Sequence, residues 1–354
     1  MKPLSLFLRS LCSLTFASAT LAVHAAEHAT ITLYHHISDS TPASTSVPPD
    51  KFREQMEHLK ADGFHVMPLP ELLSALQQRQ EVPDKTVAIT FDDGYISIYD
   101  TAFPMLQEYG FPFTVFINTQ PHNDRMNGYM SWEQIREMSD AGVTFANHME
   151  NHPYMVDALA GEDEAARIAR LRAELLRSQD RITAETGQDH KFMAYPYGEY
   201  DVPVKRMMGE LGFIGLGQHS GAVGFDSDFL ALARYPFGGS FTDLNDFKQK
   251  VQTLSFNLLE VDPETPMTTE TNPSVTLQFG PGNFNNRQIG CYAGGQPLQM
   301  EWLDQENGRV RISTEQHFNT RRFRYLCTAP ATGMPGRFYW YSKDWTRSTP
   351  NNQD

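Results

Sequence analysis

The chain has 354 residues, a length that suggests two domains or one large domain with an appendage. With 40% hydrophobic and 12% aromatic residues it can bury a real core, which excludes disorder across the whole chain. Its formal net charge of −14 argues against a protein that binds nucleic acid, because duplex binding requires a basic face. The composition predicts a soluble, acidic protein and favours an enzyme.

The first residues have the pattern of a secretory signal. Lys2 and Arg9 are the only charges there, and small or apolar residues fill positions 11–23. A small-residue cleavage site at Ala25 predicts a signal peptide over residues 1–25; the alternative is a buried first helix or a retained anchor. No later apolar run reaches the ~20 residues of a transmembrane helix. We therefore expect an exported protein, periplasmic or extracellular.

Export would determine which of the three cysteines remain in the mature protein and whether they are oxidised. Cys12 lies within the predicted signal, so the mature chain keeps Cys291 and Cys327. An oxidising compartment favours a disulfide between them. The alternative is a zinc site, for which only His317 offers a further ligand nearby.

Short β-type segments alternate with helical ones from residue 30 to about 260. Apolar residues at helical spacing predict helices over residues 52–61 and 162–186, the second ending at Gly187. The expected strands are Ile31–Leu33, Phe64–Met67, Val87–Phe91, Phe113–Ile117, Val143–Ala146, Phe192–Tyr195 and Ile214–Leu216. This α/β alternation favours a parallel sheet that is closed, or nearly closed, into a barrel.

The pattern changes near residue 262. Residues 262–273 hold three prolines and no apolar period, which predicts a linker. From residue 274 onward, short β-type runs joined by Gly, Asn and Pro turns predict a small all-β sandwich. We thus expect a first domain over residues 26–261 and a sandwich over 274–354. Its aromatic residues either pack its core or stack on sugar: Trp302, Tyr339, Trp340, Tyr341 and Trp345.

Two adjacent carboxylates follow an expected strand. Asp92 and Asp93 come directly after Val87–Phe91 and lead into a turn at Gly94. Active sites of α/β folds gather at the carboxyl ends of strands. Adjacent side chains at such a corner can point in different directions, so one can bind a metal while the other acts as a base. The alternative is an ordinary Asp-Asp-Gly turn.

Two histidines follow another expected strand. His148 and His152 lie four residues apart, and Pro153 disfavours an α conformation at His152, so we expect a loop. Together with Asp93 they form a three-ligand set with one position open for water. The alternative is a pair of surface histidines.

An aromatic segment with a proline follows the strand expected at Phe192–Tyr195. Residues 194–201 are Ala-Tyr-Pro-Tyr-Gly-Glu-Tyr-Asp. This segment is either a structural turn or a sugar-binding wall with a backbone N–H directed at the site.

In this order, the three segments resemble the motifs of the polysaccharide deacetylase family, the NodB-homology or carbohydrate esterase family 4 group. Residues 90–94 match its T-F-D-D-G motif, and 148–152 match H-S/T-x-x-H with Met149 in the Ser/Thr position. Residues 194–197 match R-x-P-Y with Ala194 in place of arginine. This variant, and Tyr-His-His-Ile at 34–37, resemble the branch acting on exported poly-N-acetylglucosamine. The resemblance covers roughly residues 31–255 and implies a distorted (β/α) barrel.

The resemblance also implies an activity, the removal of N-acetyl groups from an N-acetylglucosamine polysaccharide with release of acetate. Asp93, His148 and His152 would bind a divalent metal, most often zinc, with Co²⁺ or Ni²⁺ as alternatives. Asp92 would be the general base. The backbone N–H of Tyr197 would stabilise the oxyanion.

The general acid is not apparent, because the late L-x-H motif of the family is not evident. His35 is our candidate and His219 the alternative, while His36 should point away; a purely structural role is the other interpretation of His35. Arg234 resembles a charged residue that this branch keeps near the base, where it would orient Asp92 and lower its pKa. An ordinary surface arginine is the alternative.

Three residues are expected to contact substrate: Trp132, which could equally be a core residue, Tyr195 and Pro196. Two other functions remain open at this point. One is a non-catalytic carbohydrate-binding protein on a deacetylase fold, favoured by the missing arginine and late histidine. The other is an acetylxylan-type esterase, which would use the same groups.

Overall fold

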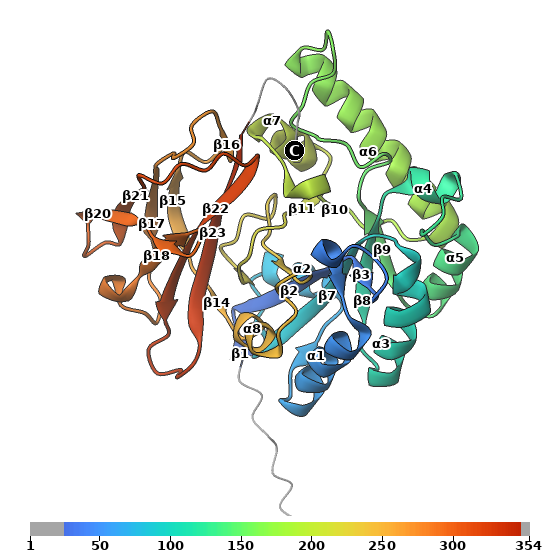
Figure 1. Ribbon diagram of the computed structural model, residues 1–354, viewed down its shortest axis with the longest axis horizontal. Coiled ribbons are helices and arrows are strands. Elements are labelled where there is room, and N and C mark those ends of the chain that lie inside the picture. Colours follow the sequence, from blue (N-terminus) through green and yellow to red (C-terminus); the bar gives the residue numbers. More distant parts are fainter. Residues whose placement is uncertain (1–24, 348–354) are drawn as a thin grey trace, which may run out of the picture.

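A computed structural model describes residues 25–347 of the chain (Figure 1). The expected signal peptide, with Cys12, lies outside the described residues except for Ala25. Within residues 25–347 we find no helix with both the length and the apolar character needed to span a membrane.

A sheet of nine strands forms the centre of the larger part of the described chain (Figure 1). Its order is β11-β10-β9-β8-β7-β2-β12, with β13 beside β2 and β5 beside β7. All pairs are parallel except β12 with β2. The sheet curls into half a barrel, which confirms the expected distorted (β/α) barrel. The strands are β2 (His28–Tyr34), β5 (His65–Val66), β7 (Thr86–Asp93), β8 (Phe113–Ile117), β9 (Thr144–Asn147), β10 (Phe192–Ala194), β11 (Ile214–Leu216), β12 (Val223–Gly224) and β13 (Tyr235–Pro236).

Both helices expected from apolar spacing are present. They are α1 (Pro49–Ala61) and α6 (Glu164–Thr186). The carboxylate of Asp163 caps the start of α6, and Gly187 ends it with a left-handed φ of 71°. The other helices are α2 (Leu69–Gln77), α3 (Phe103–Tyr109), α4 (Thr119–Asn123), α5 (Trp132–Asp140), α7 (Val202–Glu210) and α8 (Leu244–Lys250). Shorter elements are the helical turns η1 (Ala43–Thr45), η2 (Ile98–Ala102), η3 (Pro196–Gly198) and η4 (Asn286–Gln288), and the strand pairs β1 (Ala25–Ala26) with β6 (Val82–Pro83) and β3 (His36–Ile37) with β4 (Ser46–Val47).

Two further sheets form the C-terminal part of the described chain, orange and red in Figure 1. One has the order β14-β23-β22-β18-β19 with β16 beside β23, and the other the order β15-β17-β21-β20. They enclose a hydrophobic core of their own, as a sandwich requires. Their strands are β14 (Leu254–Ser255), β15 (Leu258–Asp262), β16 (Met267–Thr268), β17 (Val275–Phe279), β18 (Gly290–Ala293), β19 (Gln296–Pro297), β20 (Gln299–Asp304), β21 (Arg309–Ser313), β22 (Arg322–Pro330) and β23 (Phe338–Arg347).

The sandwich begins earlier in the chain than the sequence indicated, which corrects the expected boundary. β14 and β15 lie in the segment assigned to the first domain, yet β14 pairs with β23 and β15 with β17. The expected linker, residues 262–273, contains β16, which also pairs with β23. Lys343 Nζ donates to the carbonyls of residues 263, 264 and 265 at 2.8 to 3.0 Å. This proline-rich segment is therefore an integral part of the sandwich.

The five aromatic residues singled out in the sandwich pack against other residues rather than lying exposed on its surface. Trp345 and Tyr339 are buried, and Trp302 and Tyr341 pack half-buried against the sandwich core. Trp340 packs edge-on against a tyrosine of the larger part, with ring centroids 5.7 Å apart. Of the two alternatives, core packing is correct.

The alternation of side chains along β7 determines which face of the sheet the Asp92 carboxylate lies on. Val87, Ile89 and Phe91 belong to the core beneath α1, α3 and α5, whereas Ala88 belongs to the core of the other face. Alternate residues of a strand point to opposite faces. Asp92 therefore shares the face of Ala88, inside the curled sheet.

The carboxyl ends of the central strands lie at one edge of the sheet. In the parallel register Tyr34 lies opposite Phe91, and Ile117 lies opposite both Asp93 and Asn147. The segments that follow β2, β7 and β9 therefore meet, at the edge where α/β folds place their active sites.

A disulfide joins Cys291 and Cys327. The two residues lie directly opposite each other on β18 and β22, and both are buried in the sandwich core. The bond links positions separated by 36 residues, so it restricts a substantial loop of the unfolded chain.

We expect thiol titration of the denatured, unreduced protein to find neither cysteine free. Reduction should lower the free energy of unfolding of the sandwich by about 4 kcal/mol at most, because the unfolded chain regains loop entropy. Urea unfolding with and without reductant, followed by near-UV circular dichroism, measures the difference. Free Cys291 and Cys327 in the unreduced protein would contradict the pairing.

Candidate active site

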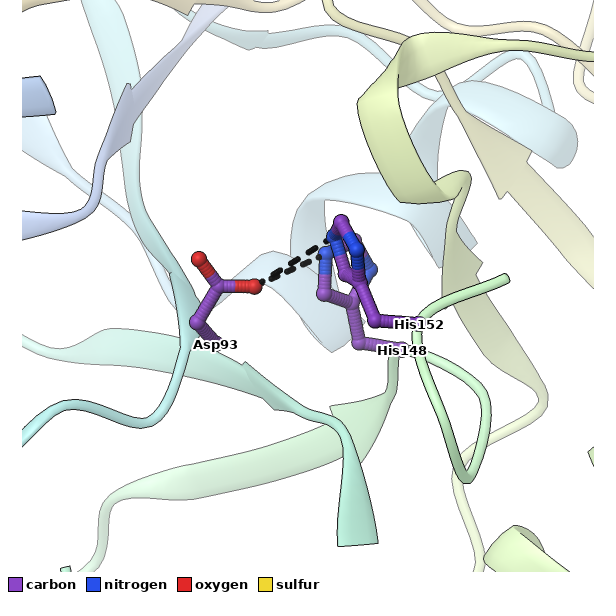
Figure 2. A group of neighbouring side chains, drawn as sticks. All are labelled: Asp93, His148 and His152. Atoms are coloured by element: carbon purple, nitrogen blue, oxygen red, sulfur yellow. Dashed lines mark ion pairs between the residues drawn. The ribbon is translucent and has the colours of Figure 1, made fainter. Parts of the chain in front are cut away.

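Among the described residues, three side chains that can bind a metal converge at the carboxyl edge of the sheet (Figure 2). Asp93 ends β7, and His148 and His152 lie in the loop after β9. Asp93 Oδ1 is 3.3 Å from His148 Nε2 and 3.5 Å from His152 Nε2. Both imidazoles face the carboxylate in Figure 2. The structure thus brings together the three ligands expected from the sequence.

The surroundings of His148 suit a metal ligand. Its Nδ1 lies 2.7 Å from the carbonyl oxygen of Ala194 and donates to it, so Nε2 is the nitrogen that faces Asp93. The side chain is fully buried, and Nε2 has no hydrogen-bond partner among the described residues. Two imidazoles and one carboxylate match the ligands of Zn²⁺ better than the all-oxygen sets of Ca²⁺ and Mg²⁺. The residues present therefore fit the implied metal.

The two histidines titrate in opposite directions. Burial, and next the charge of His148, lowers the pKa of His152 to about 4, so this imidazole is neutral at pH 7. Burial also lowers the pKa of His148, but Asp92 and Asp93 together raise it above its ordinary value. Burial raises the pKa of Asp93, whereas the imidazoles lower it further, so this carboxylate is ionised. A cation at this site therefore competes with a proton for His148 Nε2.

Left-handed backbone conformations place the ligands. Asp93, Met149 and His152 have φ values of 72°, 66° and 52°, and Tyr197 has 58°. Residues other than glycine adopt such conformations only where the surroundings hold them, at a cost of about 1–3 kcal/mol each. Met149, which replaces the Ser or Thr of the family motif, is fully buried in a hydrophobic cluster that anchors the loop.

His122 supports the turn after Asp93, and the sequence analysis missed it. A Cβ atom at Gly94, where φ is 79°, would lie 2.7 Å from His122 Nε2, so only glycine fits this turn. His122 is buried, and its Nδ1 lies 2.7 Å from the carbonyl oxygen of Met130. No local motif marks this histidine, because its role arises from packing between α4 and β7.

Asp92 lies beside the metal ligands and is paired with Arg234. Its two oxygens accept hydrogen bonds from Arg234 Nη1 and Nη2 at 2.7 and 2.8 Å, and neither side chain is exposed. Burial raises the pKa of Asp92, but Arg234 and then His148 lower it more, so the carboxylate is ionised at neutral pH. The surface alternative for Arg234 is wrong. The guanidinium absent at Ala194 is supplied from the segment before β13.

A cleft of about 800 Å³ opens over these residues. His35, Asp93, His152 and Tyr197 all line it. His36 is not among the lining residues of the described chain, and it stacks on a neighbouring tyrosine ring at 3.7 Å.

Four residues considered for the site lie outside the cleft: the three expected to contact the substrate, and His219, the alternative general acid. Trp132 is 7% exposed, packs in the core and donates its indole N–H to an asparagine. Tyr195 is fully buried, with its hydroxyl bonded to a backbone carbonyl, and Pro196 is buried beside it. His219 lies 3.3 Å from an aspartate of the sandwich and lines a separate, smaller cavity. Burial, which local sequence does not reveal, removes all four from the cleft.

Other residues of the cleft were not expected, and they come from distant parts of the chain. Met126 and Phe241 lie on its rim with 50% and 54% of their surface exposed. Arg322 and Arg324 reach into the lining from β22 of the sandwich. The sandwich therefore forms part of the cleft wall.

The half-barrel sheet is the fold of solved NodB-type deacetylases, and the Asp-Asp-Gly turn and the histidine loop lie together at its carboxyl edge. Residues 79–215 match the profile of the family described as "Polysaccharide deacetylase", a family of hydrolases. The matched segment contains both aspartates, both histidines and Tyr197, but neither His35 nor Arg234.

Three known proteins illustrate the similarity. YxkH of Bacillus subtilis, named for the polysaccharide deacetylases, is 27% identical over 205 residues, 58% of this chain and 69% of its own. The poly-beta-1,6-N-acetyl-D-glucosamine N-deacetylase of Escherichia coli K12 is 23% identical over 215 residues, 51% of this chain and 32% of its own. The solved structure of Streptococcus pyogenes deacetylase PplD in complex with acetate shares the fold, with a TM-score of 0.57, 24% identity and coverage of 63% of this chain and 98% of that one. This chain thus spans about a third of the length of the Escherichia coli relative.

We expect the two aspartates to differ in metal binding. Asp93→Asn replaces an ionised ligand by an amide and should weaken zinc binding by about tenfold or more, whereas Asp92→Asn leaves all three ligands in place. Competition with a chromophoric chelator measures both affinities, and thermal unfolding controls for loss of fold. Equal loss of zinc from two folded variants would contradict this division.

Proposed function

We propose that the protein hydrolyses N-acetyl groups of an N-acetylglucosamine-containing polysaccharide and releases acetate. The observation that carries the proposal is the cluster of Asp93, His148 and His152 beside the ion-paired Asp92, in a cleft open to solvent. Relatives named poly-beta-1,6-N-acetyl-D-glucosamine N-deacetylases support this substrate class. Zinc is the proposed metal, with Co²⁺ or Ni²⁺ as alternatives.

The side chains divide the chemistry among them. A divalent cation held by Asp93, His148 and His152 would supply Lewis acidity for the acetamide carbonyl and the attacking water. Asp92, kept ionised by its pairing with the arginine, accepts a proton from that water. The backbone N–H of Tyr197 donates to the carbonyl oxygen as negative charge develops on it.

His35 is the proposed general acid. It lines the cleft together with Asp93 and His152, whereas His36 and His219 do not line it in the described chain. The C–N bond of an amide breaks readily only when its nitrogen receives a proton. His35 donates this proton to the departing amine of the sugar.

The rim of the cleft suits a carbohydrate. Phe241 and Met126 offer exposed apolar surface on which the faces of sugar rings can pack. Phe241 takes the role that the sequence assigned to the buried Trp132 and Tyr195.

We also propose that the protein acts outside the cytoplasm, in the periplasm or the extracellular space. The disulfide between Cys291 and Cys327 supports this location, because such bonds persist in oxidising compartments.

The zinc-loaded protein should release acetate from poly-β-1,6-N-acetylglucosamine, lose this activity to a chelator and regain it with zinc or cobalt. Asp92→Asn should reduce turnover by about 10²-fold or more, as expected for loss of a general base. Acetate assays on this polymer, chitin oligosaccharides, peptidoglycan and acetylxylan measure both effects. Turnover by verified metal-free protein would refute the mechanism. Release from acetylxylan alone would indicate an esterase, and polymer binding without release a carbohydrate-binding protein.

His35→Ala should lower turnover and remove the alkaline limb of the pH–rate profile, because that limb reports loss of the proton destined for the amine. Zinc content should stay unchanged. His36→Ala is the matched control and should keep the limb. Near-normal turnover of His35→Ala with an unchanged limb would place the acid elsewhere.

A further inference from the structure

The C-terminal sandwich contacts both loops that carry the active site. We propose that Arg321, directly before β22, is a positioning residue that fixes the loop of His152 against the loop of Tyr197. The sandwich is then a working part of the catalytic centre rather than a separate module. This inference rests on the proposed function of the metal site.

Ion pairs of Arg321 tie the two loops together. Its Nε and Nη2 donate to the two oxygens of Glu199 at 2.8 and 2.7 Å, and Nη2 also donates to Asp157 Oδ2 at 3.0 Å. Glu199 lies two residues after Tyr197, and Asp157 five residues after His152. The Arg321 side chain is 8% exposed and that of Glu199 is fully buried. A buried, forked arginine–carboxylate pair fixes direction as well as distance.

A column of rings leads from the same arginine to the metal site. The guanidinium of Arg321 lies 4.7 Å from the ring centroid of Tyr154. The Tyr154 ring stacks on that of Tyr197, with centroids 4.1 Å apart and planes 8° apart. Tyr197 in turn meets the His152 imidazole at 4.4 Å and 74°. Displacement of the arginine therefore reaches a metal ligand through contacts between rigid rings.

Both loops contain a residue in a strained, left-handed backbone conformation, and this conformation needs support from neighbouring groups. His152 and Tyr197 hold left-handed φ values of 52° and 58°, which relax unless neighbouring groups oppose it. On the barrel side, Arg167 of α6 already links the same loops through the Met155 carbonyl and Asp201, each at 2.6 Å. Arg321 is the matching contact on the sandwich side. Its loss should therefore loosen the site without unfolding the barrel.

Glu199 belongs to the aromatic segment 194–201, but it has no role in the proposed chemistry. Its contacts with the sandwich give it a structural role instead. Besides Arg321, it accepts a hydrogen bond from Arg322 Nη1 at 2.7 Å. Arg322 also lies over the Tyr197 ring at 5.4 Å and lines the cleft. The acidic residue of the motif is thus the attachment point for the sandwich.

The test compares Arg321→Gln with Arg309→Gln in the full-length, disulfide-bonded protein. Arg309 makes a forked pair with Glu260 at 2.7 and 2.9 Å within the sandwich, and neither residue lines the cleft, so it is the matched control. The measurements are zinc affinity of the apo-protein, the visible spectrum of the cobalt-loaded protein, kcat and KM for acetate release, and the thermal midpoint.

Arg321→Gln should weaken zinc binding by about tenfold, change the cobalt spectrum and lower kcat more than it raises KM. Arg309→Gln should match the wild type in all of these measurements. Arg321→Lys keeps the positive charge but cannot make two parallel hydrogen bonds to one carboxylate, so its values should lie between those of the wild type and Arg321→Gln. Wild-type zinc affinity, cobalt spectrum and kcat in Arg321→Gln would overturn the proposal, even with a lowered thermal midpoint.

A second pair of variants applies if Arg321→Gln does not fold. Tyr154→Phe keeps the ring and should bind zinc more tightly than Tyr154→Leu, which breaks the column and should weaken zinc binding. Wild-type zinc affinity in Tyr154→Leu would overturn the proposal. Failure of the wild type to release acetate would refute the proposed function alone, because zinc affinity and the cobalt spectrum still test the role of Arg321.

Discussion

The parallel register of the central strands is the constraint on which the active site depends. It aligns the carboxyl ends of β2, β7 and β9, so segments far apart in the sequence meet at one edge. All eight residues of β7 are buried, which makes this strand a rigid support for the two carboxylates at its end. The unusual backbone conformations of the loops are tolerable because they start from such fixed points.

Two neighbouring carboxylates would ordinarily raise each other's pKa, and here both are ionised. Each has its own cationic or imidazole partners: Arg234 holds Asp92, and the two histidines surround Asp93. This separation lets adjacent residues take different roles. It also makes the arrangement fragile, because removing one member of a buried charge pair leaves the other unpaired at a cost of about 3–5 kcal/mol.

The sequence predicted what depends on local pattern. Apolar runs gave β8 and β11 with their observed bounds, and spacing after strand ends identified the three side chains that converge as candidate metal ligands. It did not predict β14, β15 and β16, because these short strands exist only through partners distant in the chain. Trp132 and Tyr195 were misplaced because burial of an aromatic ring is a tertiary property. Arg321 escaped notice for the same reason, since its partner Glu199 lies 122 residues away.

Contacts between the two parts of the molecule join segments that are far apart in the chain. Arg337, just before β23, donates to both oxygens of Asp84, just before β7, across 253 residues. Contacts of such separation form late, because they close the largest loops. A chain synthesised from its N-terminus completes the barrel strands long before β22 and β23 exist. The cleft wall contributed by the sandwich is therefore the last part of the catalytic centre to be assembled.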